Sequence, residues 1–94
     1  MLLVNATFTI RPETKAEFLT EINELISSSQ NETGCLAYEL YQSLATANQF
    51  VMIEQWADNA ALAQHNQNPL LQQFAQNLPH YVTQKPVILV SETK

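Results

Sequence analysis

Apolar residues recur along this chain at two different spacings, and the order in which the spacings alternate constrains the fold more than any other feature. Residues 2–10 alternate with a period of two, which is typical of a half-buried strand. Residues 18–26 repeat apolar side chains at the spacing of one helix face. The same reasoning predicts strands at 35–41, 49–56 and 87–90, and helices at 58–66 and 68–79.

Residues around the first helix predict where it begins and ends. Arg11-Pro12 should end the first strand, because the residue before proline favours extended backbone. Thr14 and Glu17 have the spacing of a capping box, in which each side chain bonds a free backbone N–H of the other residue. We expect the helix to end within the serine run at 27–29.

Single residues predict one turn and the ends of the two later helices. Gly34 is the only glycine, so we expect it where the backbone needs a positive φ angle or a close approach. Asp58 is a good N-cap for a short helix, and Pro69 is favoured at the first position of another. Pro79 is expected to end that helix and to leave His80-Tyr81 in a loop.

The order strand, helix, strand, strand, helix, strand predicts an α+β fold of the ferredoxin-like type. Four antiparallel strands would form one sheet with the helices on one face. A chain of 94 residues is expected to form a single domain, residues 1–94. The other sheet face would stay bare, and a second copy of the chain is its simplest cover, which predicts a homodimer.

Charge excludes several classes of partner. The chain has nine acidic and four basic residues, and the basic ones form no cluster. Neither a nucleic acid nor a membrane surface is therefore an expected partner. The N-terminal segment has no basic start and no long apolar run, which predicts a cytoplasmic protein.

The cysteine and histidine content gives no sign of a metal centre. Cys35 is the only cysteine and is expected to be a small buried apolar residue, because one cysteine cannot form an internal disulfide. His65 and His80 have no recognised metal-ligand spacing, and the chain lacks a phosphate-binding glycine loop. We therefore predict neither a metal nor a nucleotide cofactor.

Four short segments, in this order, resemble one known family. They match its E-x-G-C-x-x-Y, F-x-x-x-E-x-W, A-L-x-x-H and N-P-L patterns, and they lie at 32–38, 50–56, 61–65 and 68–70. The chain thus resembles the antibiotic biosynthesis monooxygenases, which include small quinol monooxygenases. Each segment alone is weakly specific, whereas the ordered set covers nearly the whole chain.

The resemblance implies a dimeric α+β barrel with a pocket between the sheet and the helices of each subunit. It also implies oxygenation without flavin or metal, in which an electron-rich phenol or quinol is deprotonated and its anion passes an electron to dioxygen. Other reactions occur on the same fold, so the resemblance alone does not fix the chemistry.

His65 and Trp56 are the predicted catalytic residues. A neutral imidazole can accept a phenolic proton, although His65 could instead be a structural residue bonded to a loop carbonyl. The Trp56 indole could stack on an aromatic ring and exclude water, or simply fill the core.

Three further residues are predicted to bind the substrate. Glu54 and Phe50 share a strand face with Trp56, and a carboxylate there would need a partner or a raised pKa. Tyr38 could hydrogen-bond a substrate oxygen, whereas Tyr41 lies on the opposite strand face.

Three functions remain open from the sequence. The leading hypothesis is a cofactor-independent monooxygenase that acts on a small hydroxylated aromatic, such as a quinol, with dioxygen as co-substrate. A non-catalytic dimeric module that binds a small molecule would need the same pocket. An isomerase of a small phosphorylated molecule would need cations at the pocket mouth, and only Arg11 and Lys15 lie close together.

Overall fold

The computed structural model describes residues 1–93 and confirms the predicted order of elements. A single four-stranded antiparallel sheet has the order β2-β3-β1-β4. A 3-10 turn, η1 at Pro12–Thr14, precedes the first long helix. The strands are β1 at Leu2–Thr9, β2 at Cys35–Gln42, β3 at Gln49–Trp56 and β4 at Val87–Glu92. The helices are α1 at Lys15–Gln30, α2 at Asn59–His65 and α3 at Pro69–Tyr81.

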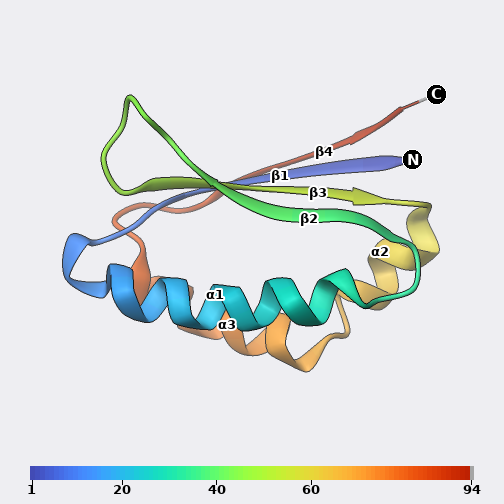
Figure 1. The fold of residues 1–94 in the computed structure, drawn as a ribbon, viewed down its shortest axis with the longest axis horizontal. Coiled ribbons are helices and arrows are strands. Elements are labelled where there is room, and N and C mark those ends of the chain that lie inside the picture. Colours follow the sequence, from blue (N-terminus) through green and yellow to red (C-terminus); the bar gives the residue numbers. More distant parts are fainter. Residues whose placement is uncertain (94) are drawn as a thin grey trace.

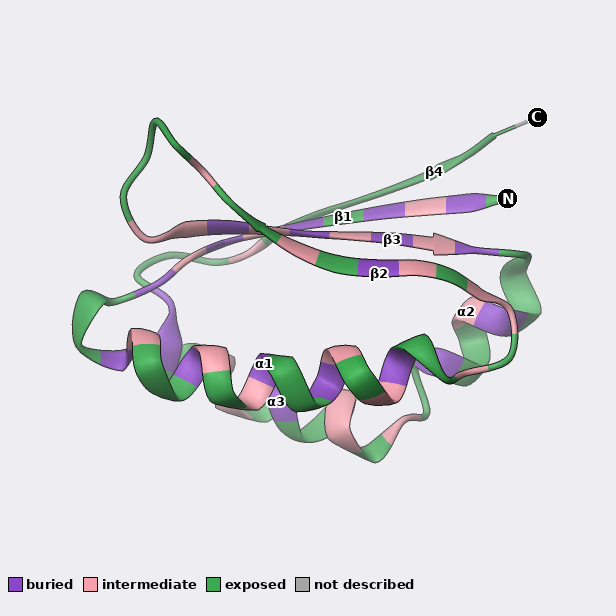
Figure 2. Cartoon of the chain, in the orientation of Figure 1, coloured by how far each residue is buried: buried purple, intermediate pink, exposed green. Residues whose placement is uncertain are grey.

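All three helices lie on one face of the sheet, and the opposite face carries no helix (Figure 1). Strand alternation explains which side chains meet the helices. Every second residue of β1 and β3 is buried, from Leu2 to Phe8 and from Phe50 to Trp56. Figure 2 shows this alternation along β3 and shows β4 exposed along its whole length. The bare face predicted from the sequence is therefore present.

The core lies between the sheet and the helices. Phe18 and Ile22 of α1 are fully buried, and Phe18 packs against Phe50 and Phe74 with ring centroids 5.3 and 6.0 Å apart. Burying a large apolar side chain contributes roughly 1.5–3 kcal/mol. This aromatic cluster fixes α1 and α3 against the sheet and so positions the elements around it.

The capping box predicted at the start of α1 is not formed. The Thr14 side chain makes no cap to the helix; its hydroxyl faces the carbonyls of Arg11 at 3.0 Å and Tyr81 at 3.3 Å. Pro12 begins the 3-10 turn instead, so the chain turns before α1 starts. Thr14 is buried, and its contact with the end of α3 explains why it faces the core.

Two predicted helix ends were also wrong. The serine run does not end α1, which continues to Gln30, because Ser29 is fully buried and the Gln30 amide donates to the Tyr38 carbonyl at 3.0 Å. Pro79 lies inside α3, which ends at Tyr81. His80 and Tyr81 therefore belong to a helix, not a loop.

Turn predictions were better. Gly34 has φ of +82°, and Asp58 caps α2 by accepting a hydrogen bond from the Ala61 N–H at 2.9 Å. Cys35 is half-buried, less enclosed than expected, because a bulge follows it in β2. Among the described residues, no helix has the length and apolarity needed to cross a bilayer.

Candidate active site

Local backbone features bring three segments together at one end of the sheet. The alternation of β3 turns Glu54 and Trp56 towards the helices, and the Asp58 cap directs α2 so that His65 lies on its buried face. Gly34 allows α2 to approach the start of β2, because a Cβ there would lie 2.5 Å from the Ala61 Cβ. The turn before β2 therefore comes within reach of His65.

His65 forms an ion-pair geometry with Glu32 from that turn. Its Nδ1 lies 2.7 Å from Glu32 Oε2, and the His65 side chain is only 3% exposed. An ionised carboxylate can only accept a hydrogen bond, so Nδ1 carries the hydrogen and Nε2 of the neutral ring keeps its lone pair. The same logic orients the histidine of a Ser-His-Asp triad.

Glu54 lies on the other side of the His65 ring. It is 7% exposed, and its Oε1 accepts a hydrogen bond from Trp56 Nε1 at 3.0 Å. His65 Nε2 lies 3.9 Å from the same oxygen, too far for a hydrogen bond. Burial raises the pKa of Glu54, while the Trp56 hydrogen bond and His65 oppose the rise.

Two aromatic rings enclose the imidazole. Trp56 has no exposed surface, and its ring centroid lies 4.5 Å from that of His65 at an interplanar angle of 33°. Tyr38 meets His65 edge-on at 5.2 Å. Burial, with the nearby charge of Glu54, raises the pKa of Tyr38 far above its ordinary value, so its hydroxyl keeps its proton. The His65 ring therefore has little freedom to rotate.

A cavity of about 320 Å³ opens next to this cluster, between the sheet and the helices. His65, Glu54 and Tyr38 line it at one end, together with Asn66. The rest of the lining is apolar, namely Val4, Ala6, Phe8, Ile22, Leu25, Met52, Leu62, Leu71, Phe74, Ala75, Leu78, Ile88 and Val90. Its size and mostly apolar wall are those of a small-molecule site.

Two predicted site residues do not line this cavity. Phe50 packs instead against Phe18 in the aromatic cluster, four residues before Glu54 on β3, which is roughly 13 Å along a strand. The alternation of the strand predicted correctly that Phe50 faces the helices, but it could not predict how far along β3 the cavity extends. Trp56 contacts the ring of His65 and the carboxylate of Glu54 from behind, so it supports the cavity wall without forming its surface.

Sequence reasoning missed Glu32 and Asn66. Glu32 is the first residue of the E-x-G-C segment, which was the only signal available for it. The two residues of the Glu32–His65 pair are 33 positions apart, so only the fold brings them together. Asn66 immediately follows α2, and no motif singles it out.

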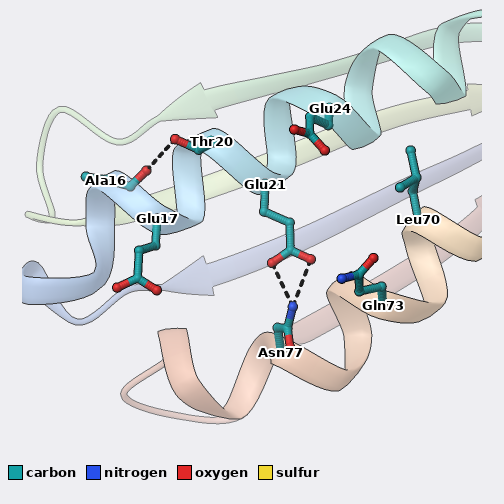
Figure 3. A pocket seen from close by; sticks show the side chains of 8 residues that line it. All are labelled: Ala16, Glu17, Thr20, Glu21, Glu24, Leu70, Gln73 and Asn77. Atoms are coloured by element: carbon teal, nitrogen blue, oxygen red, sulfur yellow. Dashed lines mark hydrogen bonds between the residues drawn. The ribbon is translucent and has the colours of Figure 1, made fainter.

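A second hollow, of about 480 Å³, lies between α1 and α3 and has an acidic wall (Figure 3). The Glu21 carboxylate accepts hydrogen bonds there from Asn77 at 3.0 and 3.1 Å and from the Tyr81 hydroxyl at 2.5 Å. Its lining has no histidine, cysteine or aromatic residue. Within residues 1–93, no three His, Cys, Asp or Glu side chains gather in an arrangement suited to a metal ion. The cavity beside His65 is the better candidate.

Comparison with known proteins settles the family. The model of the antibiotic biosynthesis monooxygenase family matches residues 1–77. The chain belongs to this family. Among sequence relatives, "Putative monooxygenase YcnE" of Bacillus subtilis (strain 168) is 36% identical over 74 residues, which are 79% of this chain and 78% of YcnE.

Solved structures of other proteins have the same fold. A crystal structure bearing the family name has a TM-score of 0.91 at 29% identity, covering 100% of this chain and 99% of the other. PA3566 from Pseudomonas aeruginosa has a TM-score of 0.87 at 31% identity, covering 99% and 93%. Family membership supports a monooxygenase-type function.

Proposed function

We propose that the protein is a homodimeric monooxygenase that oxidises a small hydroxylated aromatic or quinol with dioxygen and uses neither flavin nor metal. One observation carries the proposal. A buried histidine at the polar end of an apolar cavity has its Nδ1 hydrogen bonded to Glu32 at 2.7 Å, which leaves Nε2 free to accept a proton. Because Glu32 is not part of the cavity lining, the Nε2 edge is the one that would meet a substrate.

The proposed reaction begins with proton transfer from a substrate hydroxyl to His65 Nε2, and the Glu32 carboxylate stabilises the imidazolium. The resulting phenolate passes one electron to dioxygen, and the two radicals combine at an activated ring carbon. The peroxide anion that forms takes the proton back from His65, and the resulting hydroperoxide loses water and leaves a quinone. One oxygen atom enters the quinone and the other leaves as water, so the substrate supplies all four electrons.

The remaining predicted residues would act around this base. Tyr38 keeps its proton and could donate a hydrogen bond to a substrate oxygen, which would orient the ring. Trp56 holds the Glu54 carboxylate through its N–H and lies against the imidazole. We therefore assign Trp56 a positioning role, in place of direct stacking on the substrate.

Exposed apolar residues support the homodimer. Leu89 is 64% exposed and pairs with Asn5 on the bare sheet face, whereas Ile88 and Val90 line the open edge of the cavity. A second subunit over this face would cover Leu89 and close the cavity edge. Light scattering at micromolar concentration should give twice the chain mass for wild type and a lower mass for Leu89→Glu. A monomeric wild type would contradict the proposal.

Oxygen uptake with 1,4-dihydroxynaphthalene tests the activity after the autoxidation rate is subtracted. His65→Gln should lower kcat at least about 100-fold and Glu32→Gln at least about 10-fold, because the first removes the base and the second its orienting partner. His80→Gln is the matched control, since His80 contacts only the exposed Glu17, at 3.2 Å, among acidic groups. With ¹⁸O₂, one labelled atom should appear in the quinone. A His65→Gln rate equal to wild type would refute the mechanism.

The binding module and the isomerase, the two alternative functions, can be distinguished from the monooxygenase. A wild-type rate equal to autoxidation, together with measurable binding of the same compound, would favour the binding module. The phosphorylated substrate of an isomerase would need a cation at the cavity, and its lining has no Arg or Lys among the described residues. This absence counts against the isomerase.

A further inference from the structure

Carboxylate groups dominate the electrostatics at the polar end of the cavity. Of the side chains that line it, only Tyr38, Glu54 and His65 are titratable. The negative charge of Glu32 lies directly behind His65, 2.7 Å from its Nδ1. One carboxylate therefore lines the polar end of the cavity and a second lies behind His65, whereas no Arg or Lys is among the lining residues.

The Arg and Lys side chains of residues 1–93 lie near the other end of the sheet. Backbone bonds tie Arg11 to Tyr81 and Thr83 to Thr9, which places the connections at 10–14 and 82–86 together. Lys15 lies over the Phe50 ring at 5.9 Å. Figure 1 shows both connections at the end of the sheet away from α2. Phe50 and Glu54 are roughly 13 Å apart along β3, which is too far for the Lys15 ammonium to form an ion pair with the Glu54 carboxylate.

We propose that the cavity selects neutral ligands over anionic ligands of the same shape, and that Glu54 imposes this selection. The ligand class is a neutral hydroxyarene without a carboxylate, sulfonate or phosphate group. Its hydroxyl meets His65 and Glu54, and its ring lies against Val4, Ala6 and Phe74. The identity of the ring rests on the proposed function, whereas the charge selection is a property of binding alone.

Both orientations of an anionic ligand are unfavourable. With its charge at the polar end, it lies beside the Glu54 carboxylate, and like charges within a few ångströms in a poorly hydrated site repel strongly. With its charge at the other end, it lies among aliphatic and aromatic side chains that offer no hydrogen bond. A neutral hydroxyl avoids both costs because it donates to a carboxylate or an imidazole nitrogen.

Binding of two matched probes tests the inference. At pH 7.5, 2-naphthol is neutral and 6-hydroxy-2-naphthoate carries one negative charge on the same ring system. Calorimetry under argon should give a dissociation constant at least about 30-fold lower for the neutral compound. Glu54→Gln should lower this ratio at least about 5-fold, because the amide oxygen can still accept from Trp56 while the charge is gone.

Glu24→Gln is the control, because it removes the same charge from the separate α1–α3 hollow and should leave the ratio as in wild type. Equal binding of the two probes, or no binding of either, would overturn the inference. An unchanged ratio in Glu54→Gln would overturn the role of Glu54. Selective binding without oxygen uptake would refute the proposed function and leave this inference standing.

Discussion

Replacing Gly34 by alanine should destabilise the protein and disturb the site through two separable effects. The backbone angle φ of +82° is one that a residue with a Cβ rarely adopts, at a cost of about 1–2 kcal/mol. The new Cβ would also lie 2.5 Å from the Ala61 Cβ, about 1 Å closer than an ordinary carbon contact. Overpacking of this kind costs about 1–3 kcal/mol.

The sum, roughly 2–5 kcal/mol, is a large part of the free energy of unfolding of a small domain. Thermal unfolding at one fixed protein concentration should show Tm lower by at least about 8 °C. Because His65 lies one turn after Ala61 on α2, moving α2 should also lengthen the contact between His65 and Glu32. We therefore expect lower activity in the fraction of protein that stays folded.

A double-mutant cycle separates the two effects. Ala61→Gly removes the methyl group that the new Cβ would meet, so it should return about 1–3 kcal/mol to Gly34→Ala beyond additivity, while the φ cost remains. Ala60→Gly, at an exposed position of the same helix, is the matched control and should be additive. If Gly34→Ala had the wild-type Tm, or if both glycine variants rescued it equally, the reasoning would be refuted.

Three further tests, two of them with a matched control variant, address individual interactions. Burial raises the pKa of Glu54 above 4.5, so the stability that this group contributes is full below that pH and is lost as pH rises through the folded-state pKa. In urea titrations, Glu54→Gln should therefore be more stable than wild type at pH 8 but not at pH 4. Thr14→Val should cost about 1 kcal/mol in the same assay, because it removes a buried hydroxyl, whereas Thr20→Val on the exposed face of α1 should cost under about 0.5 kcal/mol. Asp58→Ala should cost about 1 kcal/mol through loss of the α2 cap, and Asp58→Asn, which keeps the acceptor, should stay near wild type; equal losses would argue against capping.

The strands could be predicted well because one face of the sheet is buried. A period of two in residues 2–10 and 49–56 matches the burial of alternate side chains in β1 and β3. Helix ends were harder, since contacts distant in sequence decide them. Ser29 is fully buried, so α1 continues through the serine run. The helix α3 continues through Pro79 to Tyr81, whose hydroxyl donates a hydrogen bond to Glu21. None of these contacts leaves a trace in local sequence.

The site was only partly predictable for the same reason. His65, Glu54 and Tyr38 were placed on the correct faces by periodicity and motif, and they lie together beside the cavity. Strand alternation cannot say how far along a strand a cavity extends, so it did not show that Phe50 lies outside the cavity lining. The role of Glu32 depends on a turn that brings two distant segments together, and only the folded chain reveals it.

The position of β1 in the sheet has a consequence for how the chain is assembled during synthesis. Leu2 pairs with Trp56 on one side and with Glu92 on the other, so the earliest strand must wait for both neighbours. Until then its backbone groups remain available to other chains. Pairings between strands far apart in the sequence also form slowly, because the chain loses the entropy of loop closure before the contacts can stabilise it. Synthesis of β4, more than any early local structure, should therefore determine when this sheet is completed.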